Sequence, residues 1–197
     1  MARSTMASLI QRVRTLTYAG TAEYTLGTAV FWDDDQIQTV LDQRRQDVDV
    51  RLADVTPLVH QGVLRWRDYR TDYHDLEATD GGTAVFVVTD GMGTVVPLAS
   101  YEPDYVRGVV LFNDSQGGSA RHLRARAYDV HGAAADLLDA WAAREKLAFN
   151  FSGDDQSFQR SQKFQMLGEM AAKYRAQSWP VSVRMTRGDA SAEGWQS

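Results

Sequence analysis

The most regular pattern of hydrophobic and polar positions lies late in the chain, over residues 127–177. Apolar side chains recur there at helical spacing in two stretches, which predicts two amphipathic helices. The polar turn between them, residues 149–158, contains Ser152, Asp154 and Asp155, which are suited to cap the second helix. Two long helices joined by a short turn pack as an antiparallel hairpin. We therefore expect this hairpin to form the core on which the rest of the chain packs.

Two shorter helices are predicted near the amino terminus. Residues 4–16 place apolar side chains on one helical face. The second helix follows Asp33, which is expected to cap it while Gln36 reaches back as in a capping box. Trp32 and Ile37 have the spacing of a hydrophobic staple. The pattern predicts that this helix runs to residue 47.

From residue 47 onward the period changes to two, which predicts strands. Turn-forming segments separate the candidates: residues 80–82, 90–93 and 113–118, and residues 102–104, where Pro103 predicts a turn. Asp90 and Gly91 suit the tight turn of a β-hairpin over residues 85–96. The chain therefore contains an antiparallel β region, and its expected strands are residues 48–52, 63–69, 84–89, 94–98, 108–112 and 122–127.

The helical pattern stops at Trp179 and Pro180, because proline cannot continue a helix and restricts the residue before it. Val181, Val183 and Met185 then alternate with polar residues, which predicts an extended, strand-like arm. A strand without a neighbour tends to add to a sheet edge. That edge belongs either to another subunit or to the chain's own β region, and the sequence leaves both open.

These elements predict an α+β fold. Its helical core consists of a short amino-terminal helix, a capped helix and the long antiparallel hairpin. The core carries an inserted antiparallel β module and ends in an extended carboxyl-terminal arm. The expected boundaries are residues 1–47 and 127–177 for the two parts of the core, 48–126 for the β module and 178–197 for the arm.

The composition narrows the class of protein. The chain has 197 residues, enough to bury a core, and no cysteine, which excludes disulfides, thiol catalysis and cysteine-ligated metals. A formal net charge of −5 argues against a general nucleic-acid coat protein. No apolar run approaches the roughly 20 residues that span a bilayer, and the first residues lack a signal-peptide pattern. We expect a soluble globular protein made inside the cell.

Residue types that carry chemistry are present but do not form a motif. The histidines are His60, His74, His122 and His131. Their spacing does not match a zinc site. The carboxylates of residues 33–35 and 154–155 suit a hard cation, but helix capping explains both runs better. No turn matches a phosphate-binding loop or a nucleophile elbow. The sequence therefore predicts no catalytic residue, metal ligand or cofactor.

Basic and aromatic residues of the β region are the second candidate for function. The basic ones are Arg65, Arg67, Arg70, Arg121, Arg124 and Arg126. Acidic residues interrupt them, so solvated strand faces explain them better than a nucleic-acid surface. Trp66, Tyr69 and Tyr73 are expected to form a packing or interface cluster, with base stacking as the weaker alternative.

Three passages and the order of the elements resemble one known family. The passages are residues 32–42, 127–142 and 149–162, and the order is helix, capped helix, β insertion, helical hairpin and extended arm. In these features the chain resembles the head–tail connector proteins (adaptor, or head completion) of tailed bacteriophages. The layout covers most of the chain, and the closer likeness lies in its second and fourth fifths. The β insertion is larger than in the smaller family members.

The resemblance implies a structural virion protein, not an enzyme. Such proteins form a ring, typically of twelve subunits, beneath the portal protein. The ring extends the DNA channel, through which DNA passes without specific binding, and presents a surface to the next neck or tail protein. No cofactor or membrane is implied. The protein would be made in the cytoplasm of the bacterial host and reside in the neck of the virion.

The resemblance also assigns roles to residues of this chain. The portal-docking arm would comprise Trp179, Pro180, Val181, Val183, Arg184, Met185 and Arg187. The hairpin that builds the core and the ring would comprise Tyr128, Leu137, Leu138, Trp141, Phe149, Phe151, Phe158, Phe164, Leu167 and Tyr174.

A ring of identical subunits needs two complementary faces on each subunit. The polar hairpin faces offer such a pair, with Arg144, Lys146, Lys163, Lys173 and Arg175 against Asp136, Asp139 and Glu169. Ordinary solvated helix faces explain these charges equally well. Two alternative functions stay open: another neck component, such as a stopper or tail-completion protein, and a small-molecule-binding or enzymatic domain with a pocket lined by Asp72, His74 and Glu77.

Overall fold

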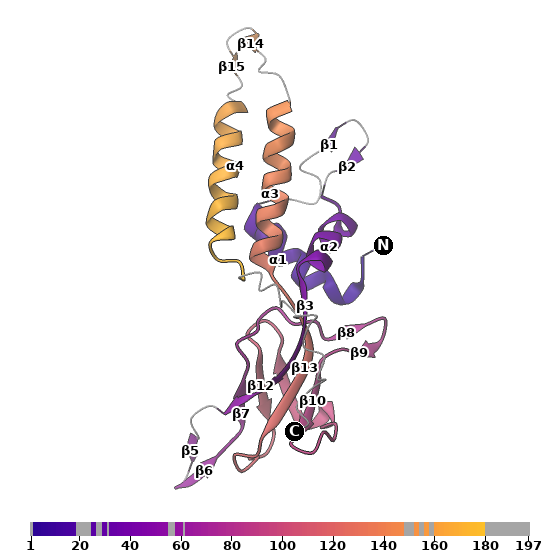
Figure 1. Cartoon of the computed structure of the whole chain (residues 1–197), viewed down its shortest axis with the longest axis vertical. Coiled ribbons are helices and arrows are strands. Elements are labelled where there is room, and N and C mark those ends of the chain that lie inside the picture. Colours follow the sequence, from indigo (N-terminus) through magenta and orange to yellow (C-terminus); the bar gives the residue numbers. More distant parts are fainter. Residues whose placement is uncertain are drawn as a thin grey trace, which may run out of the picture.

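The computed structural model describes residues 2–18, 25–26, 29–30, 32–54, 58–60, 62–147, 152–153, 156–157 and 160–179. Within them the α-helices lie at one end of an elongated molecule and the larger sheets at the other (Figure 1). The helices are α1 (Ala7–Thr17), α2 (Asp34–Gln43), α3 (Val130–Leu147) and α4 (Arg160–Arg175), with 3-10 turns η1 (Ser4–Met6) and η2 (Leu98–Ser100). The fold is mixed helix and antiparallel strand, consistent with the α+β class.

The strands form two larger antiparallel sheets. The first has the order β10–β13–β3, with β10 at Val87–Asp90, β13 at Arg121–Tyr128 and β3 at Arg45–Arg51. The second has the order β11–β12–β7–β4, with β11 at Tyr101–Asp104, β12 at Val109–Phe112, β7 at Asp68–Arg70 and β4 at Ala53–Asp54. Buried side chains of both sheets form one cluster, with Tyr69 and Phe112 in edge-to-face contact at 5.2 Å. The strands therefore enclose their own hydrophobic core.

The remaining strands among the described residues form short two-stranded ladders, at both the helical and the sheet end of the molecule (Figure 1). They are β1 (Thr25–Leu26) with β2 (Ala29–Val30), β5 (Leu58–His60) with β6 (Val63–Arg65), β8 (Thr79–Asp80) with β9 (Thr83–Ala84), and β14 (Ser152–Gly153) with β15 (Gln156–Ser157).

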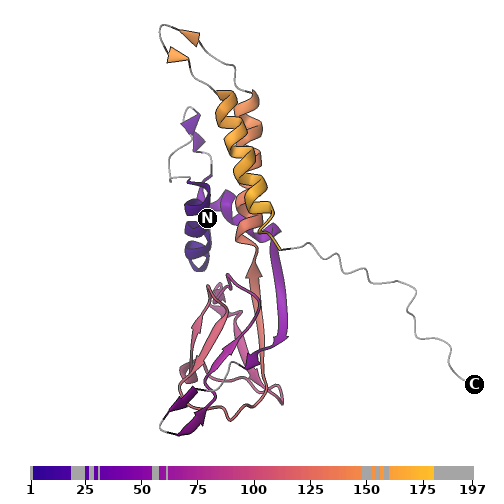
Figure 2. The ribbon, with the colours of Figure 1, turned by 90° about the vertical axis from the view of Figure 1, so that its left-hand side faces the viewer.

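The helices bury two further clusters. Met6, Leu9 and Ile10 of the amino-terminal segment pack with Ile37 of α2 and Leu137 of α3. A separate, smaller cluster joins α3 to α4. Helices α3 and α4 lie side by side and antiparallel in both ribbon views, so the predicted helical hairpin is present (Figures 1 and 2).

The start of α2 confirms the predicted capping box. The Gln36 N–H donates to the Asp33 carboxylate at 2.8 Å, and the Asp33 N–H donates to Gln36 Oε1 at 3.2 Å. Trp32 and Ile37 share the helical cluster, as the staple spacing predicted. These contacts are local, which is why the sequence alone could specify them.

The end of α2 differs from the prediction. The helix stops at Gln43 and not at residue 47, and Arg45 already belongs to β3. Residues 45–51 pair in register with residues 122–128 of β13. Residues 45–47, which the helical pattern assigns to α2, therefore belong to β3, because they pair with a strand that is distant in sequence.

Three predicted strands also need correction. Residues 63–69 divide between β6 and β7, and residues 84–89 divide between β9 and β10. Residues 94–98 form no ladder: Val95 makes one isolated bridge to Thr89, and η2 begins at Leu98. Conversely, Pro103 was expected in a turn but lies in β11, at the edge of its sheet, where a missing N–H is tolerated.

Candidate functional site

The side chains assigned to the hairpin divide between two clusters. Leu138 and Leu167 are buried where α3 meets α4. Trp141, Phe164 and Tyr174 are half-buried against the same cluster. Tyr128 and Leu137 instead belong to the cluster shared with α1 and α2. Phe149, Phe151 and Phe158 lie outside the described residues.

Helices α3 and α4 differ in how far they are covered. Helix α3 packs against α1, α2 and α4, and it buries residues on several faces, among them Ala133, Ala135 and Leu138. Among the described side chains of α4, only Leu167 and Ala171 are buried. The outward face of α4 is therefore open to solvent within the described chain.

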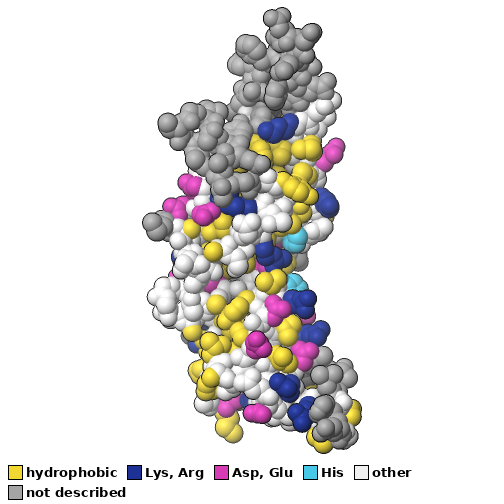
Figure 3. Space-filling model, turned by 180° about the vertical axis from the view of Figure 1, so that it is seen from behind, with side chains coloured by type: hydrophobic (Ala, Val, Ile, Leu, Met, Phe, Trp, Pro, Cys, Tyr) yellow, Lys and Arg dark blue, Asp and Glu magenta, His cyan; other side chains and the backbone are white. Residues whose placement is uncertain are grey.

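Apolar groups lie on this open face. Met166 is 54% exposed, and Met170, one helical turn later, is half-buried at the edge of the α3–α4 cluster. Figure 3 shows hydrophobic side chains exposed among lysines and arginines over the helical end of the molecule. Exposed apolar side chains next to a buried seam are typical of a surface that packs on a partner. We refer to Met166 and Met170 as the α4 face; Phe164 packs on the α3–α4 cluster and is not part of it.

Several hairpin charges make contacts within the chain. Arg175 pairs with Asp139, and it approaches Asp136 at 3.9 Å. Asp136 also receives two hydrogen bonds from Arg44, at 2.7 and 2.8 Å. Lys163 lies over the ring of Trp141 at 4.9 Å. These charges stabilise the hairpin and its contact with the end of α2.

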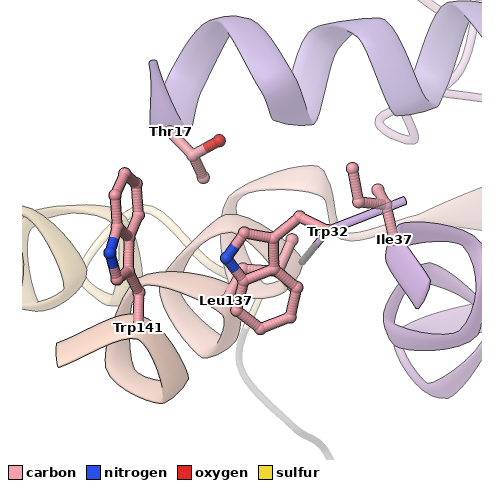
Figure 4. Close-up of a pocket in the computed structure, with 5 residues that line it drawn as sticks. All are labelled: Thr17, Trp32, Ile37, Leu137 and Trp141. Carbon is pink, nitrogen blue, oxygen red and sulfur yellow. The ribbon is translucent and has the colours of Figure 1, made fainter. Parts of the chain in front are cut away.

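A small apolar cavity lies between α1 and α3. Thr17, Trp32, Ile37, Leu137 and Trp141 line it, and Figure 4 shows both indole rings at its border. Its volume of about 10 Å³ holds at most one water molecule. The cavity is too small for a substrate.

The carboxyl end of α4 is fastened to the start of α3. Asp129 accepts a hydrogen bond from the Gly132 N–H at 2.8 Å, and so caps α3. The other oxygen of the same carboxylate accepts from Ser178 Oγ. Trp179 then packs on the β core, with its ring edge-to-face with Tyr73 at 5.9 Å. We call Asp129, Gly132, Ser178 and Trp179 the arm anchor.

Gly132 is needed for this geometry. A Cβ at this position would lie 2.2 Å from Asp129 Oδ2 and 3.0 Å from Ser178 Oγ. Since real Cβ atoms do not approach other atoms so closely, only glycine admits both partners at this distance. The arm anchor fixes where Trp179 leaves the folded body. The remaining residues of the expected arm, Pro180 onward, lie outside the described residues.

A buried ionic cluster joins the amino-terminal segment to the β region. Glu77 has a side chain with no solvent exposure, and it accepts from the Tyr128 hydroxyl at 2.7 Å and from Thr5 at 3.3 Å. Arg3 and Arg126 approach its carboxylate at 3.3 and 3.6 Å. Burial, together with the hydrogen bond to Glu77, raises the pKa of Tyr128 well above its ordinary value, so this phenol stays a neutral donor. We call these residues the Glu77 cluster.

The residues of the enzymatic alternative do not converge. Glu77 is buried, whereas Asp72 and His74 are exposed. His74 Nδ1 lies 3.3 Å from the carbonyl oxygen of Arg107. No group of three or more histidines, aspartates and glutamates within the described residues is placed to hold a metal ion. The carboxylates of residues 33–35 include the Asp33 cap and Asp34, which pairs with Arg14 at 2.6 Å.

The arginines of the β region engage several neighbours. Arg67 donates to the carbonyl of Phe112, Arg70 pairs with Asp68 at 2.9 Å, and Arg126 pairs with Asp80. Of the aromatic residues singled out with them, Tyr69 is buried in the β core and Tyr73 meets Trp179. Trp66 packs beside Gly118. These contacts are structural. Tyr69 and Tyr73 take a packing role at the β core, but Trp66 is not among the residues of that core, so the three do not form the single cluster that the sequence predicted.

Sequence reasoning missed both the Glu77 cluster and the arm anchor. The Glu77 cluster joins residues more than seventy positions apart, and neither its acid nor its bases stand in a motif. The arm anchor did leave one signal, because glycine inside a helix is costly and usually has a packing reason. Gly132, in the first turn of α3, is such a glycine.

His131 makes the stability of the hairpin sensitive to pH. Its ring lies 5.9 Å from that of Tyr174, between α3 and α4. Burial lowers the pKa of His131 below its ordinary value, the Asp129 carboxylate opposes this, and Arg12 adds to it. The unfolded chain therefore binds more protons than the folded one below about pH 6.5, so stability is complete above that pH and falls as the pH drops.

We expect the thermal unfolding midpoint to fall between about pH 7.5 and pH 5, and to fall less in His131→Gln. Circular dichroism at 222 nm measures both. The matched control is His74→Gln, at an exposed position. Equal pH dependence in His131→Gln and the unmodified chain would show that His131 is not responsible.

Comparisons with known proteins add no identification: no protein-family model matches the chain, and no curated protein shows significant sequence similarity. The described helices include none that combines the length and the apolar character needed to cross a membrane.

Proposed function

We propose that the protein is a structural subunit of a ring, the head–tail adaptor in the neck of a tailed bacteriophage. The ring would sit beneath the portal, extend the DNA channel and offer an attachment surface to the next neck or tail protein. Its residence in the virion and a count of twelve subunits follow from the family resemblance of residues 32–42, 127–142 and 149–162. The protein would have no catalytic role and no cofactor.

The α4 face is the observation that carries this proposal. A helix that buries one narrow stripe against α3 and exposes methionine on its other side is suited to pack on a neighbour. Methionine adapts to irregular contacts, which suits repeated packing between identical subunits. A closed ring uses such a face against a different face of the next subunit.

The arm anchor supports the same proposal. Ser178 and Trp179 hold the beginning of the carboxyl-terminal segment at one defined place, beside Asp129 and Tyr73. A docking arm needs a fixed origin, since its reach is set by the point at which it leaves the body. The portal-docking role of Trp179 and of the residues that follow is part of this proposal.

The mild negative charge is compatible with a DNA channel. A net charge of −5 limits strong attraction to phosphates, which would oppose sliding of DNA.

A charge on the α4 face tests the proposal. Met166→Asp places an unpaired carboxylate in the expected contact, so self-association should weaken at least about tenfold, which corresponds to about 1.4 kcal/mol. Analytical ultracentrifugation over a concentration series measures this. The matched control is Met92→Asp, at a position that is 95% exposed in the turn after β10. Association that is equally weakened by both changes, or by neither, would remove the α4 face from the interface.

Crosslinking then separates the adaptor from its neighbours in the neck. A photoreactive residue in place of Val183 should crosslink to the portal protein in assembled particles. Crosslinking to a tail-tube protein would instead favour a stopper or tail-completion role.

A further inference from the structure

Strand β3 leaves one edge open. It pairs with β13 on one side, and no strand among the described residues pairs with its other side. The N–H of Leu52, directly after β3, donates to the carbonyl of Arg121 at 2.9 Å. The backbone N–H and C=O groups of the even-numbered residues of β3 therefore point toward β13. Backbone groups alternate along an antiparallel ladder, so Asp47 and Asp49 direct their N–H and C=O groups to the open edge. Such groups accept an added strand.

The described chain ends beside the start of this edge. Ser178 bonds the Asp129 side chain, and the Asp129 N–H donates to the carbonyl of Arg44 at 3.2 Å, one residue before β3. Figure 2 shows the carboxyl end of α4 next to the first residues of β3. Residues 180–197 follow from this point. A strand that starts here and runs along β3 is parallel to it and needs no long connection.

The apolar residues of this segment alternate so that they would all lie on the core side of the sheet. Trp179 packs on the core between the two sheets, as does half-buried Val50 at the open edge. Alternate residues of a strand share a face. Val181, Val183 and Met185 would therefore lie on the same side as Trp179 and cover Val50.

The polar residues fit the other side of the sheet. Asp47 and Asp49 lie exposed on the outer face of β3. The alternation places Arg184 on that face, where it is expected beside Asp49. In a parallel ladder the backbone of Val181 and Val183 would face Asp47, so Pro180, which lacks an N–H, falls at a position that donates no bond to β3.

We propose that residues 181–187 add to the open edge of β3 in their own chain, as a parallel strand. The segment and β3 have the same length, seven residues each. This pairing concerns the free chain and does not depend on the ring. If the proposed function also holds, residues 181–187 would leave the β3 edge on assembly and pair with an edge of the portal protein instead. The β3 edge is then the holding site of the arm before assembly.

Hydrogen exchange measured by NMR tests the pairing in the full-length chain. The amides of Asp47 and Asp49 should exchange slowly, and Val183→Pro should accelerate both at least about tenfold by removing a donor and breaking the added strand. The amides of Val48 and Val50, which face β13, should not change. Ala192→Pro, beyond the proposed strand, is the matched control. Identical exchange at Asp47 and Asp49 in all three chains would overturn the pairing.

A cysteine pair identifies the chain that supplies the strand. The protein has no cysteine, so Asp49→Cys with Arg184→Cys creates the single possible pair. Oxidation at low protein concentration should give a disulfide within one chain, seen as a faster-migrating monomer on a non-reducing gel. Glu102→Cys with Arg184→Cys is the control, because Glu102 lies on β11, at the edge of the other sheet. Disulfide-linked dimers in place of the monomer would overturn the same-chain assignment. Neither result bears on whether the α4 face forms a ring.

Discussion

Replacement of Glu77 by alanine is expected to destabilise the protein by about 3 kcal/mol, the lower part of the range for breaking a buried ion pair. The side chain of Glu77 has no solvent exposure, and Tyr128, Arg3 and Arg126 all meet its carboxylate. Without it the Tyr128 hydroxyl loses its acceptor. The two arginines are each about a quarter exposed and keep Asp42 and Asp80 as partners, so the loss stays below the upper limit.

Urea unfolding followed by tryptophan fluorescence measures this loss. The midpoint should fall while the slope of the free energy against urea is unchanged. Glu102→Ala is the matched control, an exposed glutamate on the edge strand β11, and it should change stability by less than about 0.5 kcal/mol. Equal, small effects of both substitutions would mean that the Glu77 cluster contributes nothing to the joint between the amino-terminal segment and the β region.

The second large effect is expected from Gly132→Ala. The added methyl group would overlap the Asp129 carboxylate, so either the cap of α3 or its bond to Ser178 must move. Overpacking of this kind costs about 1–3 kcal/mol, and loss of a helix cap costs about 1 kcal/mol. We expect a total loss of about 2–4 kcal/mol. Displacement of Ser178 should also free Trp179 from Tyr73.

Gly168→Ala is the matched control, and it is expected to raise the stability that Gly132→Ala lowers. Gly168 lies inside α4, and a Cβ there would meet no atom within 4 Å. Alanine should therefore stabilise the helix by about 0.5–1 kcal/mol. Thermal and urea unfolding measure the change in stability of the two variants. The wavelength of the fluorescence maximum reports the exposure of tryptophan. A stable Gly132→Ala protein would contradict the close packing of the arm anchor.

The features predicted correctly from sequence depend on short-range physics. The capping box of Asp33 and Gln36 needs only four consecutive residues, and both partners were identified. The helical hairpin was predicted because long periodic stretches specify helices well. The tight turn after Asp90 was also identified: Asp90 Oδ1 accepts from the amides of Met92 and Thr94, both at 2.9 Å.

The features that sequence reasoning missed depend on distant partners. The helix α2 ends early because β13, some eighty residues later, pairs with residues 45–51. Pro103 looked like a turn residue, and only its position on an edge strand explains why a ladder accommodates it. The sequence assigns both Leu137 and Leu138 to the hairpin, yet the two side chains belong to different clusters. Adjacent helical positions point in different directions, and the identity of each neighbour is not encoded locally.

In the candidate site, too, local features were predicted from the sequence and contacts between distant residues were not. Trp179 was singled out as the start of an arm, and the structure places it on the β core beside Tyr73. The partners that hold it there, Asp129 and Ser178, come from the start of α3 and the end of α4, which no periodicity connects. The complementary ring faces were predicted from the charged residues on the polar sides of the two hairpin helices. The structure shows that Arg175 and Asp139 already bond each other.

The mass of the purified chain in solution, alone and mixed with the portal protein that the proposed function assigns to it as a partner, tests the ring most directly. The chain has a mass of 22.0 kDa. A closed ring should appear as one species at a fixed integer multiple of that mass, alone or on the portal, and Met166→Asp should abolish it. A monomer in both samples, at concentrations where the portal itself is assembled, would contradict the proposed function.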